Sequence, residues 1–252
     1  MTVGVVGEGS LADRVAEVAD AASEPVARGT AGEVLATDPE AVVAVGESAL
    51  LALVGESVEV PVLPVGAGPG YGGVDADASG DRANALSGVR SLLAGEFDLE
   101  SRAVLGVSVD GERAGRALAD AMLVTTEPAR ISEYSIRSRG ERVARVRADG
   151  VVVSTPTGSP GYGRGAGGPL LEPGTGVVGV VPIAPFAVNV DTWVLDATEA
   201  VELSVERDEG DVSLLLDDRR VRSVSVHATV EVSRDGALAL ARVPESRSFF
   251  ER

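Results

Sequence analysis

The sequence predicts an open, parallel α/β domain joined to a β-rich, β-sandwich-like domain. Up to about residue 95, apolar runs alternate with helical segments, which is the pattern of a parallel sheet with crossover helices. From about residue 102, short strand-like runs follow one another between turn residues, without helical periodicity. The length of 252 residues and the apolar fraction of 44% allow two such cores. We expect the first domain over residues 1–95 and the second over 96–236, with 237–252 able to pack back on the first.

The first half alternates strands with helices in a regular order. Leu11, Val15 and Val18 share one face of the first helix, and Ala41–Val45 is a continuous apolar run of the kind found in buried parallel strands. The expected elements are strands at Thr2–Val6, Ala41–Val45 and Val58–Val65, and helices at Leu11–Ala22, Thr30–Leu35, Ala49–Val54 and Asp81–Leu93.

The second half is predicted to consist of short, mostly antiparallel strands. They are rich in β-branched residues and are bounded by glycine, proline, aspartate or serine. The expected strands are Val104–Val109, Ala121–Thr125, Ile131–Ser138, Arg142–Arg147, Val151–Ser154, Gly176–Pro182, Trp193–Leu195, Ala200–Val205, Val212–Leu216, Arg222–His227 and Val230–Val232.

Composition restricts the environment and the chemistry. The formal net charge is −17, and every one of the 22 cationic residues is arginine. Such a surface repels nucleic acid and anionic membranes, and it suits a cytoplasm at molar salt, where screening mutes self-repulsion. We therefore expect a halophilic, cytoplasmic protein. We expect no membrane span, because no apolar run is long enough to cross a bilayer. With no cysteine and one histidine, thiolate metal sites are excluded and a Ser-His-Asp triad is disfavoured.

Open α/β sheets bind ligands at the carboxyl ends of their strands. Three loops meet this condition in the first half: Gly7–Ser10, Gly46–Ser48 and Gly66–Gly73. The first loop lacks the G-x-G-x-x-G spacing, so it is a weak signature of a dinucleotide oxidoreductase, which stays an alternative.

The loop with Glu47 carries the strongest chemical signal of the three. Glu47 follows a strand and precedes a helix, whose free N–H groups can bind phosphate, with Ser48 as a cap. A carboxylate there can hold Mg²⁺ or orient a hydroxyl for attack on a phosphoryl group. The other interpretation is a solvated acid favoured by the helix dipole, and position alone favours it.

The most informative segment of the chain runs from Asp149 to Tyr162. A β-branched strand leads into a turn of hydroxyl residues, proline and glycine, which presents backbone N–H groups and hydroxyls to a ligand. The alternative is an ordinary hairpin connection.

The same segment resembles the DG-hydrophobic-STPTGSTAY signature of the NAD kinase family. Thr157–Tyr162 resembles its TGSTAY motif, and Ala166–Pro169 keeps the AGGP that follows. Val181–Pro185 resembles the family's Pro-Ile-x-Pro segment, and Asp217–Asp218 stands in place of a DG turn. Ser248–Phe250 resembles the terminal aromatic pair.

The resemblance continues, with more substitutions, in the first half. Val45–Leu51 resembles the GGDGT segment, with Glu47 in place of the aspartate. Pro64–Gly68 resembles GVNxGxLGF without its asparagine. Ala119–Asp120 resembles the Asn-Glu/Asp motif, with alanine in place of asparagine.

The resemblance implies a two-domain fold with NAD between the domains. The family moves the terminal phosphoryl group of ATP, or of polyphosphate in some members, to the 2′-hydroxyl of NAD, and needs Mg²⁺. Glu47 would then orient or deprotonate that hydroxyl and help to hold the metal. The remaining implied residues are Gly46, Ser48 and Gly66 on the phosphate side, and Asp120, Thr157, Gly158, Ser159 and Tyr162 on the dinucleotide. A homodimer or homotetramer is also implied.

Departures from the family pattern keep a second function open. Glu47 carries one methylene more than aspartate, Ser48 adds a Cβ where the family has glycine, and Pro160 removes an N–H from the turn. These changes are compatible with a non-catalytic, nucleotide-binding regulatory paralogue. A related small-molecule kinase of the same superfamily is a further alternative. If the chain is an NAD kinase, Glu47→Asp is expected to raise turnover.

Overall fold

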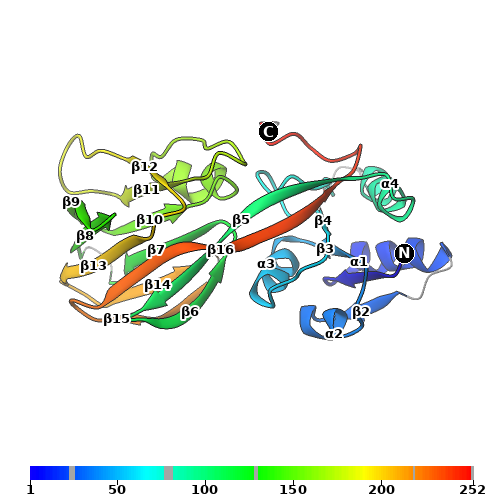
Figure 1. Ribbon diagram of the computed structural model, residues 1–252, viewed down its shortest axis with the longest axis horizontal. Coiled ribbons are helices and arrows are strands. Elements are labelled where there is room, and N and C mark those ends of the chain that lie inside the picture. Colours follow the sequence, from blue (N-terminus) through cyan, green and yellow to red (C-terminus); the bar gives the residue numbers. More distant parts are fainter. Residues whose placement is uncertain (23–25, 77–81, 128–129, 218, 251–252) are drawn as a thin grey trace. The chain divides into compact units, whose positions relative to one another are not determined.

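The computed structural model describes residues 1–22, 26–76, 82–127, 130–217 and 219–250. The chain divides into two compact units (Figure 1). Unit 1 contains Met1–Arg102 and Ala237–Arg252, and unit 2 contains Ala103–Gly236. The domain bounds expected from the sequence, 1–95 with 237–252 packing back on the first domain and 96–236 for the second, stay a prediction.

Unit 1 is built on a parallel sheet, as the sequence predicts. Its strands are β1 (Val3–Val6), β2 (Ala27–Gly29), β3 (Ala41–Val45) and β4 (Val62–Val65). They lie in the order β2-β1-β3-β4, and every pair is parallel. The end of β16 (Thr229–Arg242) adds a parallel neighbour to β4, where Leu240 pairs with Val62.

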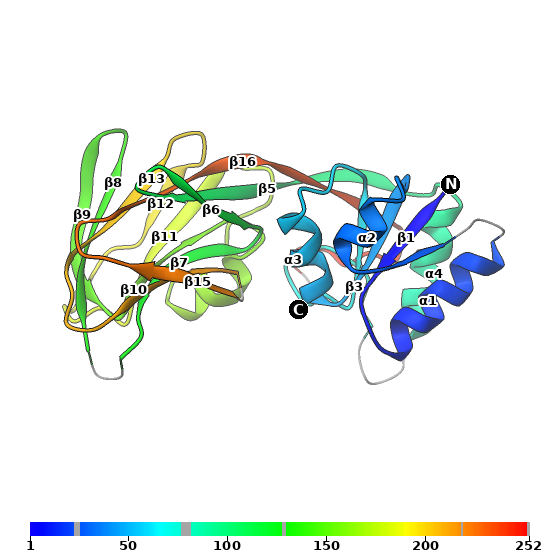
Figure 2. The ribbon, with the colours of Figure 1, turned by 90° about the horizontal axis from the view of Figure 1, so that it is seen from below.

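Helices cover both faces of this sheet, because successive strand residues point to opposite sides. α1 (Ser10–Ala21) packs against α4 (Arg82–Leu93) on the face that carries Val3 and Val5 (Figure 2). α2 (Ala31–Leu35) lies against the other face, where Gly4 leaves room for Val34. α3 (Glu47–Gly55) packs against α2.

The strand order creates a switch point between β1 and β3. The chain leaves β1 toward β2 on one side and later returns to β3 on the other side. At such a point the loops after the two strands diverge and leave a crevice at their carboxyl ends, which is where open α/β sheets bind ligands. The loops concerned begin at Gly7 and Gly46.

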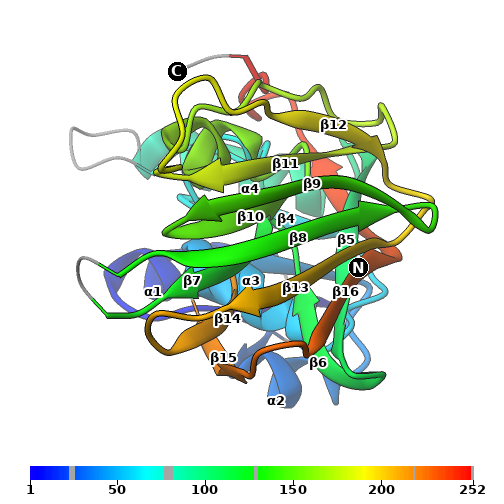
Figure 3. The same ribbon diagram turned by 90° about the vertical axis from the view of Figure 1, so that its left-hand side faces the viewer.

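Unit 2 is a sandwich of two largely antiparallel sheets (Figure 3). One sheet contains β16, β13, β8 and β9, with β5 and β6 beside β16, and the other has the order β12-β11-β10-β7-β14-β15. The inner faces form one core, which includes Leu105, Leu123, Ile136 and Leu203. The strand bounds not given above are β5 Asp98–Val109, β6 Glu112–Ala117, β7 Asp120–Thr125, β8 Ser132–Ser138, β9 Glu141–Ala148, β10 Gly150–Ser154, β11 Val177–Ile183, β12 Trp193–Asp196, β13 Val201–Arg207, β14 Val212–Leu216 and β15 Arg219–Val224.

The fold class predicted from the sequence is confirmed, and several local predictions are wrong. The sequence patterns missed β2 and β6, and β4 begins at Val62 and not at Val58. β5 and β16 extend well beyond the expected Val104–Val109 and Val230–Val232. The strand expected at Arg222–His227 ends at Val224, and His227 lies in a turn with φ 67°. Ser48 does not cap α3, since Gly46 is the N-cap residue and makes no side-chain hydrogen bond. Asp81, Asp218 and residues 251–252, which figured in the sequence predictions, lie outside the described residues.

In the part of the chain that the structure describes, no helix has both the length and the apolar character needed to span a bilayer.

Candidate functional site

Glu47 lies where the sequence predicts it, at the carboxyl end of β3. It is the first residue of α3 and is exposed. The preceding Gly46 has φ 89°, a conformation that favours glycine, so the chain can turn sharply from strand to helix. The N–H of Gly46 donates to the carbonyl oxygen of Val65 over 2.8 Å. The structure therefore brings Gly46, Glu47 and the loop that begins at Gly66 together.

Tyr71 is a site residue that the sequence did not reveal. Its hydroxyl donates to Oε1 of Glu47 over 2.6 Å, and the residue is only 7% exposed. The one signal available was an aromatic residue inside the glycine-rich segment Gly66–Gly73, in a chain with 3% aromatic residues.

The loop that carries Tyr71 is held by two arginines. Arg102 donates from Nη1 to the carbonyl oxygen of Gly70 over 3.1 Å, and Arg242 donates from Nη1 to that of Gly72 over 2.5 Å. Glu100 lies between them, with its oxygens 2.8 Å from Nε of Arg102 and 3.4 Å from Nε of Arg242. Burial lowers the pKa of the Arg102 guanidinium, and Glu100 raises it in part. The two cations are thus partly neutralised beneath the loop.

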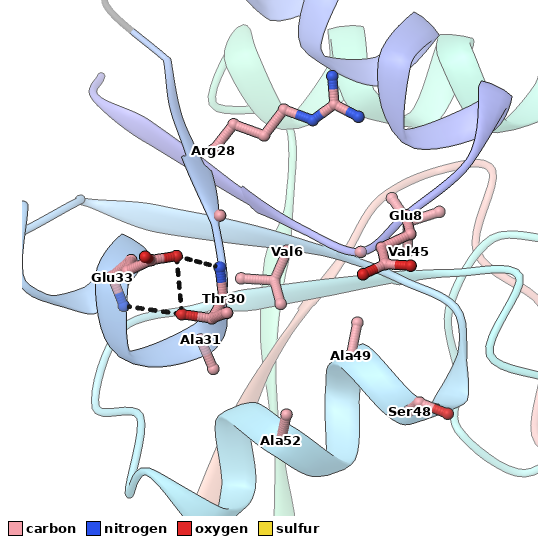
Figure 4. A pocket seen from close by; sticks show the side chains of 12 residues that line it. Val6, Glu8, Arg28, Thr30, Ala31, Glu33, Val45, Ser48, Ala49 and Ala52 are labelled. Carbon is pink, nitrogen blue, oxygen red and sulfur yellow. Dashed lines mark hydrogen bonds between the residues drawn. The ribbon is translucent and has the colours of Figure 1, made fainter.

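A pocket of about 690 Å³ opens at the switch point of the sheet (Figure 4). Residues from the ends of β1, β2 and β3 and from α2 and α3 line it. Val6, Val45 and three alanines form an apolar wall, while Glu8, Arg28, Thr30, Glu33 and Ser48 contribute polar groups. Ser48 directly follows Glu47, so the carboxylate-bearing turn borders this pocket.

One edge of the pocket is structurally fixed by the start of α2. The N–H and hydroxyl of Thr30 both donate to Oε2 of Glu33 over 2.9 Å, and the N–H of Glu33 donates back to Oγ1 of Thr30. This reciprocal capping box satisfies N–H groups at the N-terminus of the helix. The bonds from Thr30 lower the pKa of Glu33.

In unit 2, the glycine-rich turn after β10 docks on the start of β7. The N–H of Thr155 donates to the carbonyl oxygen of Ala119 over 2.9 Å, and its hydroxyl donates to that of Leu118 over 2.6 Å. Gly158 lies directly against the backbone of Ala119. The predicted residues Thr157 and Gly158 are therefore next to the segment that carries Asp120.

The predicted site residues of unit 2 differ in exposure. Asp120, Thr157 and Ser159 are buried, whereas Tyr162 is 49% exposed. The hydroxyl of Ser159 donates to the carbonyl oxygen of Pro156 over 2.8 Å and accepts from the N–H of Leu171 over 2.9 Å. Ser159 thus stabilises the turn itself.

Asp217 anchors the same segment from the other side. Its carboxylate accepts from the N–H groups of Leu118, Ala119 and Asp120 over 3.0, 2.7 and 3.1 Å. Burial raises the pKa of Asp217, and the three N–H donors lower it in part. The sequence suggested a turn here but not this anchoring contact, which joins residues about a hundred positions apart.

The site fits a metal ion that is held mainly by substrate phosphates and water and by only one carboxylate of the protein. Within the described residues, no group of three or more His, Cys, Asp or Glu side chains is placed to hold a metal ion. Mg²⁺ characteristically keeps several waters and binds one or two carboxylates together with substrate phosphates. Oε1 of Glu47 accepts from Tyr71, and a carboxylate has a second oxygen with which to ligate a cation. Glu47 can therefore supply one such carboxylate oxygen.

Comparison with solved structures identifies the fold. The NAD kinase from Archaeoglobus fulgidus in complex with ATP superposes with a TM-score of 0.75 at 20% identity, covering 95% of this chain and 93% of that chain. The yeast NADH kinase complexed with NADH gives a TM-score of 0.79 at 16% identity, covering 97% and 84%. The fold of this chain is that of NAD and NADH kinases.

Sequence relatives are more specific. A family model of the ATP-NAD kinase C-terminal domain matches residues 118–237. The NAD kinase of Methanoregula boonei is 32% identical over 214 residues, which are 84% of this chain and 76% of that protein. The NAD kinase of Methanoculleus marisnigri is 32% identical over 217 residues, 85% of this chain and 78% of that protein. The chain belongs to the NAD kinase family, which confirms the resemblance seen in its motifs.

Proposed function

We propose that this protein transfers the terminal phosphoryl group of ATP to the 2′-hydroxyl of NAD and so produces NADP. Membership of the NAD kinase family is the observation that carries the proposal. The position of Glu47, on a sharp strand-to-helix turn beside the switch-point pocket, supports it. Phosphoryl transfer depends mainly on positioning and on stabilisation of charge, and this turn offers both a carboxylate and a helix N-terminus.

The character of the pocket supports a nucleoside triphosphate as the donor. Its apolar wall, formed by Val6, Val45 and alanines of α2 and α3, suits the faces of a nucleobase. A polyphosphate chain has no apolar part to place there. The solved relative from Archaeoglobus fulgidus is a complex with ATP, which agrees with this choice.

The chemical step assigns one role to Glu47. The 2′-oxygen of the ribose bonds to the terminal phosphorus of ATP, the bond from that phosphorus to the bridging oxygen breaks, and ADP leaves. Glu47 orients the 2′-hydroxyl and accepts its proton. Mg²⁺, when bound to the phosphates, neutralises their charge. Gly46, Ser48 and Gly66 form the phosphate side, and Asp120, Thr157, Gly158, Ser159 and Tyr162 hold the dinucleotide.

Three properties of the setting belong to the same proposal. A net charge of −17 without lysine supports a halophilic protein. A cytoplasmic location is part of the proposal, because such a charge suits a cytoplasm at molar salt. A homodimer or homotetramer is proposed by analogy with the family.

The direct test measures NADP formation by the purified protein in molar KCl with NAD and Mg²⁺. We expect product with ATP and at least about tenfold less with polyphosphate, a difference of about 1.4 kcal/mol in transition-state stabilisation. If NAD binds in calorimetry but no NADP is formed, the result would contradict the proposal and favour the regulatory alternative.

Filling the donor pocket provides a second prediction. Ala52 lines the pocket from α3, and Ala52→Phe would occupy the space of a nucleobase. We expect the KM for ATP to rise at least about tenfold, which corresponds to about 1.4 kcal/mol, while the KM for NAD stays within about twofold. Ala21→Phe, at an exposed position of α1 that does not line the pocket, is the matched control. An equal rise in the KM values for ATP and NAD would contradict the placement of ATP in this pocket.

A further inference from the structure

We propose that Tyr71 is a positioning residue that orients the Glu47 carboxylate for phosphoryl transfer. The inference rests on the proposed function, because it concerns the geometry of that reaction. It begins from the 2.6 Å hydrogen bond between the Tyr71 hydroxyl and Oε1 of Glu47. Neither the motifs of the chain nor its resemblance to the family assigns a role to this tyrosine.

The need for such a contact follows from the length of the Glu47 side chain. Glu47 occupies the first position of α3 and is exposed, so packing alone leaves the torsions of its side chain largely free. A misplacement of about 1 Å at a reacting group can cost about a hundredfold in rate. A hydrogen bond from a fixed donor restricts the carboxylate to one orientation and leaves its second oxygen for the reaction.

Tyr71 meets the requirement for a fixed donor. The residue is 7% exposed, and a tyrosine has few torsions to restrict. Its phenol hydroxyl is a hydrogen-bond donor. Oε1 of Glu47 is therefore bonded to a buried group with few torsions.

The backbone around Tyr71 is fixed on both sides. The carbonyl of Gly70, before it, accepts from the buried Arg102, and the carbonyl of Gly72, after it, accepts from Arg242. The side chain of Arg102 is 2% exposed, and the ring of Phe249 lies 5.7 Å from its guanidinium carbon. Charge-assisted bonds of this kind are stronger than neutral ones. The chain of contacts thus runs from the buried Arg102 and the partly buried Arg242, through the loop, to the carboxylate.

The decisive variant is Tyr71→Phe, which removes one oxygen and keeps the ring. We expect kcat for NADP formation to fall about tenfold, while the KM values for NAD and ATP stay within about twofold. Tyr134→Phe, which removes a buried hydroxyl bonded to Thr125 in unit 2, is the matched control and is expected to keep kcat. Arg242→Lys weakens the hydrogen bond to the carbonyl oxygen of Gly72 and should also lower kcat, by about threefold.

A double-variant cycle separates positioning from general stabilisation. Urea midpoints are measured for the wild type, Tyr71→Phe, Glu47→Ala and the double variant, and the losses of the single variants should not add if the two side chains are bonded. Additive losses would overturn the contact, whether or not the protein is active. If the wild type makes NADP but Tyr71→Phe and Arg242→Lys keep kcat within about twofold, the positioning role is wrong and the proposed function stands. If the wild type makes no NADP, the proposed function fails, and the positioning role fails with it.

Discussion

Glu47→Gln is expected to lower the rate of NADP formation by about 10²- to 10⁴-fold, the range typical of losing a general base. The amide keeps the size of the side chain and can still accept the bond from Tyr71, but it cannot take the proton of the 2′-hydroxyl or ligate Mg²⁺ as an anion. Initial rates at saturating NAD and ATP measure the effect. The affinity for NAD, determined by calorimetry, should change little.

The control for this prediction lies in the same helical turn. Ser48→Ala removes only a hydroxyl beside the pocket and should reduce the rate far less than Glu47→Gln. If the Glu47→Gln variant forms NADP at the wild-type rate, Glu47 is not the general base, and the role that the family resemblance implies for it is wrong.

The hydrogen bond to Tyr71 changes the expectation for Glu47→Asp. The sequence alone predicts a gain in turnover, because aspartate is the family residue. In the structure, a carboxylate one methylene shorter would be drawn away from a tyrosine hydroxyl that now lies 2.6 Å from Oε1. We therefore expect Glu47→Asp to lower kcat, and Tyr71→Phe to have no further effect on kcat in the Glu47→Asp background.

The fold class was predictable because it depends on local patterns. Ala41–Val45 is buried along most of its length and so reads as an unbroken apolar run. β2 escaped detection because it has only three residues, and β6 because its sequence has no apolar run and carries exposed glutamate and arginine side chains. Strands of this kind depend on hydrogen bonds to a neighbour more than on their own side chains.

The candidate site was predictable only where sequence neighbours act together. Glu47 could be found because a strand end and a helix start flank it. Tyr71 lies 24 residues further on, and Asp217 lies 98 residues from the N–H group of Ala119 that it binds. Contacts over such separations are created by the tertiary fold, so no local spacing announces them.

Gly158→Ala is expected to have the second large effect, since it tests the dinucleotide side of the proposal. A Cβ at this position would overlap the carbonyl oxygen of Ala119 and lie 2.5 Å from the carbonyl carbon and 2.7 Å from Cα. Backbone cannot yield as a flexible side chain can, so the turn would have to separate from β7. Overpacking of this kind costs about 1–3 kcal/mol of folding stability.

The same separation should weaken NAD binding, because Thr157 and Asp120 would no longer keep their relative positions. We expect at least about a tenfold loss of NAD affinity by calorimetry, or about 1.4 kcal/mol. A lower urea midpoint should accompany it, followed by fluorescence of the single tryptophan, Trp193, which packs against the unit 2 core. Gly165→Ala, in the same loop but at a position where an added methyl group would have no atom within 4 Å, is the matched control. Loss of stability with unchanged NAD affinity would mean that the turn supports the sandwich and does not hold the dinucleotide.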